Sequence, residues 1–313
     1  MNAQTIEKGF NPYRWIATTL ASTFHYDLDP TRRLVTPEPA DLHTTEHLVL
    51  TPGDCRIPGM LFRPKAASGQ AVLLGHGTGA DLLLPNYRLI ETMLARGITV
   101  MTFELDGHGD NPRPLGYPSC LGCVPLVLSH LRRLEGVDPD RIGYLGMSLG
   151  SVMGLHAAFE APWLKAMVLI ATPLKVELSE RSRLAEALGL LHPTLVPTLT
   201  EASVDHLLGI LMNPVRFDDE KAYSLLDREC YESVGKLIEA LDPLAKASEL
   251  SAIPTRLIHG EWDNVVPLET AYRLLDALPG PADLVTIPRK NHLTLLFHQP
   301  TAIAACEWFE EHL

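Results

Sequence analysis

Short apolar runs that alternate with helical patterns are the feature that most constrains how this chain can fold. Three of these runs, at residues 71–74, 98–103 and 166–170, carry no charged side chain. A strand that is buried on both faces gives a continuous apolar run, whereas a half-buried strand alternates apolar with polar residues. Because helical segments separate the runs, we expect an α/β fold with a doubly wound, mostly parallel sheet.

The same pattern extends over most of the chain and predicts a sheet of eight strands. We expect the strands at residues 46–51, 57–62, 71–75, 98–103, 141–145, 165–171, 255–259 and 283–287. We expect the main helices between and after them at residues 86–96, 120–134, 149–160, 268–278 and 299–312. Residues 1–45 precede this pattern and are interpreted as an N-terminal extension.

One long interval interrupts the alternation between the sixth and the seventh expected strand. It contains no strand-like run and is interpreted as helices at residues 179–191, 200–212, 216–227 and 230–241, with breaks before prolines that would stop a helix. A helical block at this point predicts a cap over the sheet. The expected domains are the extension 1–45, a core of 46–172 and 250–313, and a helical cap of 173–249.

Composition and charge exclude several classes of partner. The 313 residues are 46% hydrophobic and 20% charged, which is typical of a globular protein, and the formal net charge is −12. An acidic chain without basic clusters is a poor partner for nucleic acid or an anionic membrane, and no apolar run is long enough to cross a bilayer. The N-terminus lacks the pattern of a secretory signal. We therefore expect a cytoplasmic protein that acts on a small molecule, either as a monomer or as a homo-oligomer.

Two patterns that can indicate metal or redox sites are weak here. The chain has five cysteines, an odd and sparse set that indicates reduced thiols, and Cys120 and Cys123 form a lone C-x-x-C pair without further ligands for zinc. His43 and His47 match an H-x-x-E-H pattern, which binds zinc only on a helix, whereas Leu48-Val49-Leu50 favours a strand. We expect neither a metal nor a cofactor.

A serine lies between glycines at the end of the fifth expected strand. The sequence there is Gly146-Met147-Ser148-Leu149-Gly150, and a helical pattern follows. A tight turn from strand to helix exposes a nucleophile at the carboxyl edge of a sheet, and bulky residues at the glycine positions would crowd that turn. The simpler alternative is a close-packed turn with an uninvolved serine.

A serine hydroxyl needs a general base, and the base needs an orienting acid. Asp263 follows the strand expected at 255–259, and His292 follows the strand expected at 283–287. Ser148, Asp263 and His292 therefore each come just after a strand, which predicts a Ser-His-Asp triad at one edge of the sheet.

The loop Gly75-His76-Gly77-Thr78-Gly79 follows the third expected strand and lacks the spacing of a phosphate-binding loop. Such a glycine-rich loop can bring a backbone N–H beside a nucleophile, so we expect the N–H groups of Thr78 and Leu149 to form an oxyanion hole. We expect His76, Met147 and Asp106 to border the substrate pocket.

Taken together, these motifs resemble those of the α/β-hydrolase superfamily, in particular serine esterases with a helical cap. The matching pieces are His76-Gly77, Asp106-Gly107-His108-Gly109, Gly146 to Gly150, His259-Gly260 with Asp263 and Val266-Pro267, and Asn291-His292. Residues 140–145 are similar to the dienelactone-hydrolase branch, although position 148 is serine rather than cysteine. The long insertion is similar to that of serine aminopeptidases, capped esterases and carbon–carbon bond hydrolases.

The resemblance implies a serine hydrolase that cleaves a carboxylic ester through an acyl-enzyme intermediate, with a largely apolar substrate of small to medium size. A carbon–carbon bond hydrolase or a thioesterase on the same triad is the alternative, and the former would need a cationic group such as Arg113 or Arg181. An alternative of another class is a non-catalytic member of the fold that binds a ligand.

Overall fold

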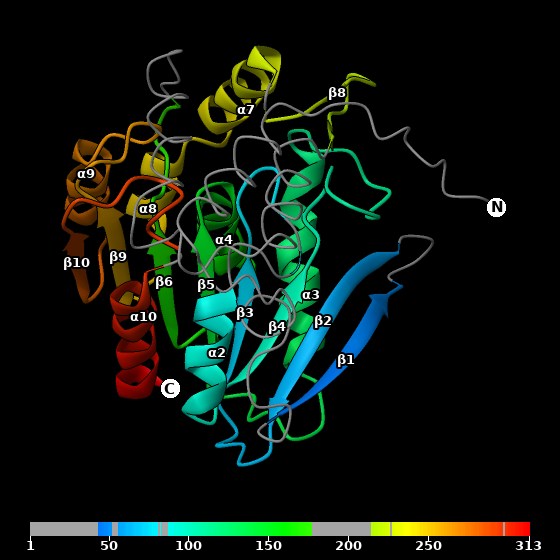
Figure 1. Ribbon diagram of the computed structural model, residues 1–313, viewed down its shortest axis with the longest axis vertical. Coiled ribbons are helices and arrows are strands. Elements are labelled where there is room, and N and C mark those ends of the chain that lie inside the picture. The colour runs from blue at the N-terminus through cyan, green and yellow to red at the C-terminus, as the bar shows by residue number, and fades with distance from the viewer. Residues whose placement is uncertain are drawn as a thin grey trace, which may run out of the picture.

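A computed structural model describes residues 43–51, 56–80, 82, 87–176, 214–225, 227–296 and 298–313. Its centre is an eight-stranded sheet in the order β1-β2-β4-β3-β5-β6-β9-β10 (Figure 1). The strand β2 runs antiparallel to both β1 and β4, and the other neighbours pair in parallel. The expected α/β fold with a mostly parallel sheet is therefore confirmed.

Each of the eight strands lies where the sequence predicts one. Their bounds are β1 His43–Leu50, β2 Ile57–Pro64, β3 Ala71–Gly75, β4 Thr99–Phe103, β5 Ile142–Met147, β6 Ala166–Ile170, β9 Thr255–Gly260 and β10 Ala282–Ile287. The largest shift is at β1, which begins three residues before the expected position because His43 still pairs with Pro64 of β2.

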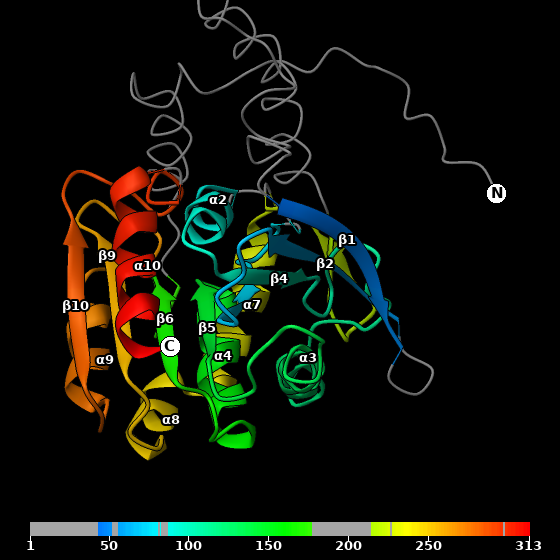
Figure 2. The ribbon, with the colours of Figure 1, turned by 90° about the horizontal axis from the view of Figure 1, so that it is seen from below.

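Helices cover both faces of the sheet, as the continuous apolar runs require. On one face lie α2 (Tyr87–Ala95) and α10 (Gln299–His312), and on the other lie α3 (Cys123–Leu131), preceded by the short 3₁₀ helix η1 (Ser119–Gly122), α4 (Leu149–Glu160) and α9 (Glu269–Ala277) (Figure 2). Successive residues of β3 show why its run has no polar position. Ala71 and Leu73 belong to the core that contains α3 and α4, whereas Val72 and Leu74 belong to the core that contains α2 and α10.

The helix expected at residues 216–227 is wrong. Here the chain forms a hairpin of two short strands, β7 (Val215–Arg216) and β8 (Ala222–Tyr223). Glu220 has a φ of 66°, which an α-helix does not allow, and the Phe217 N–H donates across the hairpin to the carbonyl of Lys221. Phe217 also forms a bridge with Leu115 of the core. This tertiary pairing takes the place of local helical bonds.

The rest of the interval between β6 and β9 is described in part. Helix α7 (Arg228–Leu241) confirms the helix expected at 230–241, and α8 (Pro243–Glu249) follows it. Asp242 separates the two helices with a φ of 41°, and its side chain accepts a hydrogen bond from the N–H of Ala245. The helices expected at 179–191 and 200–212 lie outside the described residues, so the placement of a cap over the sheet stays a prediction.

The side chain of Tyr144 packs between β3, β5 and α4 and contacts glycines of β3 and α4. Tyr144 of β5 is fully buried, and its hydroxyl donates to the carbonyl of Gly150 over 2.5 Å. A Cβ at Gly75 would lie 2.1 Å from this hydroxyl, and a Cβ at Gly154 would lie 2.1 Å from the tyrosine ring. Glycines at both positions therefore make room for the ring between a strand and a helix.

We expect Gly154→Ala to destabilise the protein and Gly235→Ala to stabilise it, although both glycines lie in helices. The first variant overpacks against Tyr144, which typically costs about 1–3 kcal/mol. The second has nothing within 4 Å of the new methyl group, and alanine is favoured over glycine in a helix by roughly 0.5–1 kcal/mol. Urea unfolding measures both free energies. A Gly154→Ala variant as stable as the wild type would contradict the packing around Tyr144.

Candidate active site

Ser148 lies on a strained turn between β5 and α4. Its φ is 48° and its ψ is −117°, a conformation that costs a non-glycine residue on the order of 1–3 kcal/mol. A Cβ at Gly150 would lie 2.2 Å from the carbonyl oxygen of Gly75, and one at Gly146 would lie 2.6 Å from the carbonyl oxygen of Gly150. Only glycine fits at either position, as the crowding argument from the sequence requires.

Hydrogen bonds from two neighbouring elements hold this turn. The Ser148 N–H donates to the carbonyl of Ile170 in β6 over 2.9 Å. The Ser148 carbonyl accepts from both the N–H and the hydroxyl of Ser151, at 3.0 and 2.5 Å. Backbone strain persists only where the surroundings compensate for it. These hydrogen bonds therefore hold Ser148 in its strained conformation.

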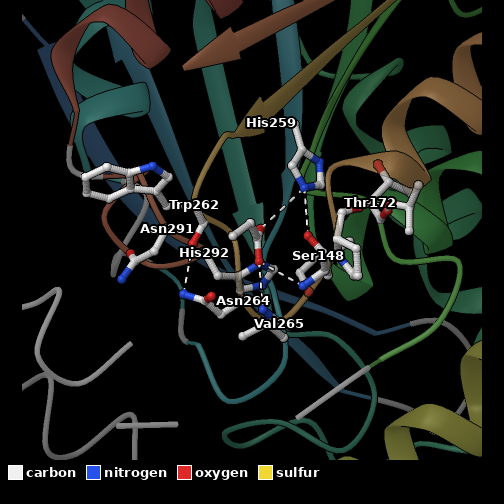
Figure 3. A network of polar contacts seen from close by, with 12 residues as sticks. Ser148, Thr172, His259, Trp262, Asn264, Val265, Asn291 and His292 are labelled. Carbon is white, nitrogen blue, oxygen red and sulfur yellow. Dashed lines mark hydrogen bonds and ion pairs between the residues drawn. The ribbon is translucent and has the colours of Figure 1, made fainter. Parts of the chain in front are cut away.

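Asp263 and His292 meet at the ends of β9 and β10. Oδ2 of Asp263 lies 2.8 Å from Nδ1 of His292, and Oδ1 accepts from the N–H groups of Val265 and Val266 at 2.9 and 2.8 Å. Figure 3 shows His292 in one network of polar contacts with Ser148 and His259. The aspartate and the histidine come together although their positions differ by 29 in the sequence.

Burial tends to raise the pKa of the Asp263 carboxyl group. His292 opposes this effect through its charge and its hydrogen bond, with smaller contributions from His259 and the Val266 N–H, and the pKa is held below its ordinary value. An ionised Asp263 takes a hydrogen bond from Nδ1 of His292, which leaves the basic lone pair of a neutral imidazole on Nε2. This tautomer is the one that a general base needs.

Two backbone contacts explain why the loops after β9 and β10 lie together. The Trp262 N–H donates to the carbonyl of Lys290 over 3.0 Å, and the Glu261 N–H donates to that of Ile287 over 3.1 Å. A Cβ at Gly260 would lie 2.3 Å from the Lys290 carbonyl oxygen, so this close approach also needs glycine.

His259 is a residue of this site to which sequence reasoning assigned no role. It is buried at the end of β9, and its Nε2 lies 2.9 Å from the carbonyl of Val266 and 3.6 Å from Oδ2 of Asp263. Burial is the main cause that lowers its pKa. A neutral His259 that donates to Val266 braces the loop whose N–H groups hold Asp263. Its position directly before Gly260 and four residues before Asp263 is the signal in the sequence.

The glycine-rich loop after β3 passes directly beside Ser148. A Cβ at Gly77 would lie 3.4 Å from Cβ of Ser148 and 3.3 Å from the sulfur of Met147. Thr78 follows in this loop and is half-buried, whereas Leu149 is the first residue of α4 and is fully buried. The first N–H groups of a helix have no partner within the helix. Both segments thus lie close to Ser148, and their oxyanion role stays a prediction.

The three residues expected to border the pocket lie in the interior. Met147 belongs to the core that contains α2 and α10, and His76 binds backbone groups of two loops. Asp106 lies 3.2 Å from Nη2 of Arg113 and also accepts from Asn111. Their role in a pocket stays a prediction.

The residues of the two weak metal or redox patterns lie in regular secondary structure. Cys120 lies in η1 and Cys123 is the first residue of α3, and both are buried free thiols. Burial is the main cause that raises the pKa of Cys120 to about 12. His43 and His47 lie in the strand β1. Within the described part of the chain, no three histidine, cysteine or acidic side chains are grouped as metal ligands, and no helix has the length and apolarity needed to span a membrane.

Comparison with known proteins identifies similar families and folds. The family model described as "Serine aminopeptidase, S33" matches residues 66–297. A 2-hydroxy-6-oxo-6-(2'-aminophenyl)hexa-2,4-dienoic acid hydrolase of Metapseudomonas resinovorans is 27% identical over 75% of this chain and 81% of its own. A pimeloyl-[acyl-carrier protein] methyl ester esterase of Xylella fastidiosa is 25% identical over 77% of this chain and 95% of its own. The solved structure of DcsB with its substrate analogue superposes with a TM-score of 0.65 at 17% identity, over 86% of this chain and all (100%) of that one.

We expect the stability of the wild type to rise relative to Asp106→Asn as the pH falls from 7 towards 4. Burial is the largest effect on Asp106 and raises its pKa to about 6, although Arg113, Cys123 and Asn111 act in the opposite direction. The ordinary pKa of an aspartate, which applies to the unfolded chain, is about 3.9. Between pH ~4 and ~6 the folded protein therefore binds more protons at Asp106 than the unfolded chain does. The resulting stability is present below pH ~4 and lost as the pH rises through ~6.

Urea unfolding at a series of pH values measures this difference, and the exposed Asp140→Asn serves as the matched control. Equal pH dependence of the wild type and Asp106→Asn would contradict the prediction, because other titrating groups are common to both proteins.

Proposed function

The chain belongs to the serine aminopeptidase S33 family of α/β-hydrolases, and we propose that it cleaves a carboxylic ester with Ser148 as nucleophile, His292 as general base and Asp263 as orienting acid. The observation that carries the proposal is the buried pair of Asp263 and His292, joined by 2.8 Å at the same edge of the sheet as the strained Ser148 turn. Such a pair supplies the base that a serine hydroxyl lacks.

The proposed reaction is acyl transfer to water. His292 takes the proton from Ser148 while the hydroxyl oxygen attacks the ester carbonyl, and Asp263 stabilises the imidazolium that forms. The N–H groups of Thr78 and Leu149 bind the oxyanion, where one donor is typically worth ~3 kcal/mol. His292 then protonates the leaving alcohol, activates a water molecule, and the acyl group is released from Ser148.

Two observations favour an ester over another bond. The relative in Xylella fastidiosa is described as a methyl ester esterase. A carbon–carbon bond hydrolase would need a cationic pocket group, and the guanidinium of Arg113 is already engaged by Asp106 and by the carbonyl of Ser119 at 2.6 Å. The other candidate, Arg181, lies outside the described residues.

The second candidate function is carbon–carbon bond hydrolysis on the same triad. The observation in its favour is the relative in Metapseudomonas resinovorans, which is described as a hydrolase of a dienoic acid. A dienoic acid of that kind carries a carboxylate, so it is distinguished from a neutral ester by charge.

The proposed substrate is small to medium in size and largely apolar. Leu225, which follows β8, supports this part of the proposal because its side chain packs on Gly79 of the glycine-rich loop. A Cβ at Gly79 would lie 2.5 Å from the terminal carbon Cδ1 of Leu225. An apolar side chain therefore lies against the loop that borders Ser148.

We expect the wild type to hydrolyse p-nitrophenyl esters within one band of acyl chain lengths between acetate and decanoate. Ser148→Ala should lose at least about a thousandfold in kcat/KM, as is typical for the nucleophile of a triad. The control is Ser248→Ala at an exposed position of α8, which should keep the activity of the wild type.

Labelling of Ser148 by a fluorophosphonate distinguishes the remaining outcomes. A labelled protein that hydrolyses no ester of the series would overturn the choice of bond and favour the dienoic acid or thioester alternatives. A protein in which Ser148 takes up no label would overturn the catalytic role and favour a ligand-binding member of the fold.

A further inference from the structure

Two histidines outside the proposed triad are buried in a reciprocal arrangement beside the active site. His76 lies in the loop after β3, and His108 lies in the loop after β4. The Gly79 N–H of the first loop donates to Nε2 of His108 over 3.0 Å, and the Leu105 N–H of the second loop donates to Nε2 of His76 over 3.1 Å. The two rings meet edge to face, with their centroids 4.9 Å apart.

The hydrogen bonds define which nitrogen of each ring carries the proton. Because Nε2 of both rings accepts from a backbone N–H, each ring must be neutral and protonated on Nδ1. Nδ1 of His76 then donates to the carbonyl of Gly77 over 2.8 Å, and Nδ1 of His108 donates to that of Asp106 over 2.9 Å. Each imidazole thus uses its one donor and its one acceptor on the backbone.

These contacts hold both peptide planes that flank Thr78. The plane before it contains the Gly77 carbonyl, which His76 binds, together with the Thr78 N–H. The plane after it contains the Gly79 N–H, which binds to His108. In a trans peptide the carbonyl and the N–H point in opposite directions. A hydrogen bond that fixes the Gly77 carbonyl therefore also fixes the direction of the Thr78 N–H.

We propose that His76 and His108 are positioning residues, which hold the Thr78 N–H in the direction that an oxyanion on Ser148 requires. This inference rests on the proposed function, since it concerns the oxyanion hole of that reaction. Neither ring contacts the reacting atoms in this scheme, and both act through the peptide planes around Thr78. We call this arrangement of His76 and His108 the histidine clamp.

The histidine clamp is also connected to the insertion that follows β6. Arg216 of β7 has its backbone N–H bound to the Gly107 carbonyl over 2.9 Å, and its guanidinium donates to the carbonyls of Gly109, over 2.9 Å, and Asn111. These acceptors lie on both sides of His108 in the chain. The position of His108, and through it that of Gly79, therefore depends on a residue of the insertion.

The surroundings of His108 keep this ring of the histidine clamp in its neutral form. Burial is the main cause that lowers the pKa of His108 to about 3, the nearby guanidinium of Arg216 lowers it further, and the backbone carbonyls of Asp106 and Leu105 oppose the shift. A protonated ring could not accept from the Gly79 N–H. His108 therefore keeps its acceptor for the Gly79 N–H well below neutral pH.

The test compares variants that remove the clamp with variants that keep its key hydrogen bond. His76→Leu removes the donor to the Gly77 carbonyl, whereas His76→Asn offers an amide N–H near the position of Nδ1. His108→Leu removes the acceptor for the Gly79 N–H, whereas His108→Gln offers an amide oxygen near the position of Nε2. His156→Leu is the matched control, because Nε2 of His156 binds a backbone carbonyl, that of Leu241 over 2.7 Å, away from both loops.

We expect the leucine variants to lower kcat for p-nitrophenyl esters about 10- to 100-fold with little change in KM, since losing one whole oxyanion donor costs roughly 100- to 1000-fold. A trifluoromethyl ketone, whose adduct with Ser148 carries the same oxyanion, should bind more weakly in proportion to the loss in kcat/KM. The asparagine and glutamine variants should recover most of both quantities, and Arg216→Ala should show a smaller loss in the same direction.

A purely structural role would give a different result. In that case the leucine variants would lower thermal stability as His156→Leu does, while folded enzyme would keep its kcat and its affinity for the ketone, and the proposal would be overturned. Amide exchange of the peptide that contains Gly79 supplies a measurement without turnover. Unchanged exchange in His108→Leu would overturn the clamp itself, whereas a wild type inactive on every ester would overturn the proposed function.

Discussion

The site depends on how closely the loop after β3 approaches the turn that carries Ser148. Gly150 has no room for a Cβ because the carbonyl oxygen of Gly75 would lie 2.2 Å away, and a Cβ at Gly77 would lie within 3.4 Å of Cβ of Ser148. A backbone N–H can reach an atom bonded to Ser148 only if no side chains separate the two segments. The glycine at position 150 is therefore required by this close approach, which lies directly beside the strained backbone of Ser148.

Buried imidazoles recur around the site, and their surroundings decide what each can do. His292 faces the carboxylate of Asp263, which leaves a basic nitrogen on the side away from it. His76, His108 and His259 have backbone carbonyls as the partners of their donor nitrogens, so they act as neutral braces between loops. The same residue type thus serves as a general base in our proposal at one position and as a fixed hydrogen-bonding group at three others.

Much of the fold could be predicted from the sequence because its strands are buried on both faces and leave continuous apolar runs. The positions of Ser148, Asp263 and His292 after strands were sufficient to expect them at one edge of the sheet. The hairpin β7–β8 could not be predicted in this way, since two-residue strands leave no periodicity and the bridge between Phe217 and Leu115 joins residues that are far apart in the sequence. The contact between His76 and His108 could not be predicted for the same reason. Each ring binds the loop in which the other ring lies, and the two loops follow different strands.

The hairpin has a consequence for exchanging the insertion between related enzymes. A graft that replaced everything from residue 173 to residue 249 would remove Arg216, whose backbone and side chain complete the hydrogen bonds of Gly107, Gly109 and Leu115 in the core. The segment expected to form the cap therefore includes a residue that is hydrogen-bonded to loops of the core. A chimera that keeps residues 214–225 with the core, and exchanges only the segment before them, would leave these bonds in place.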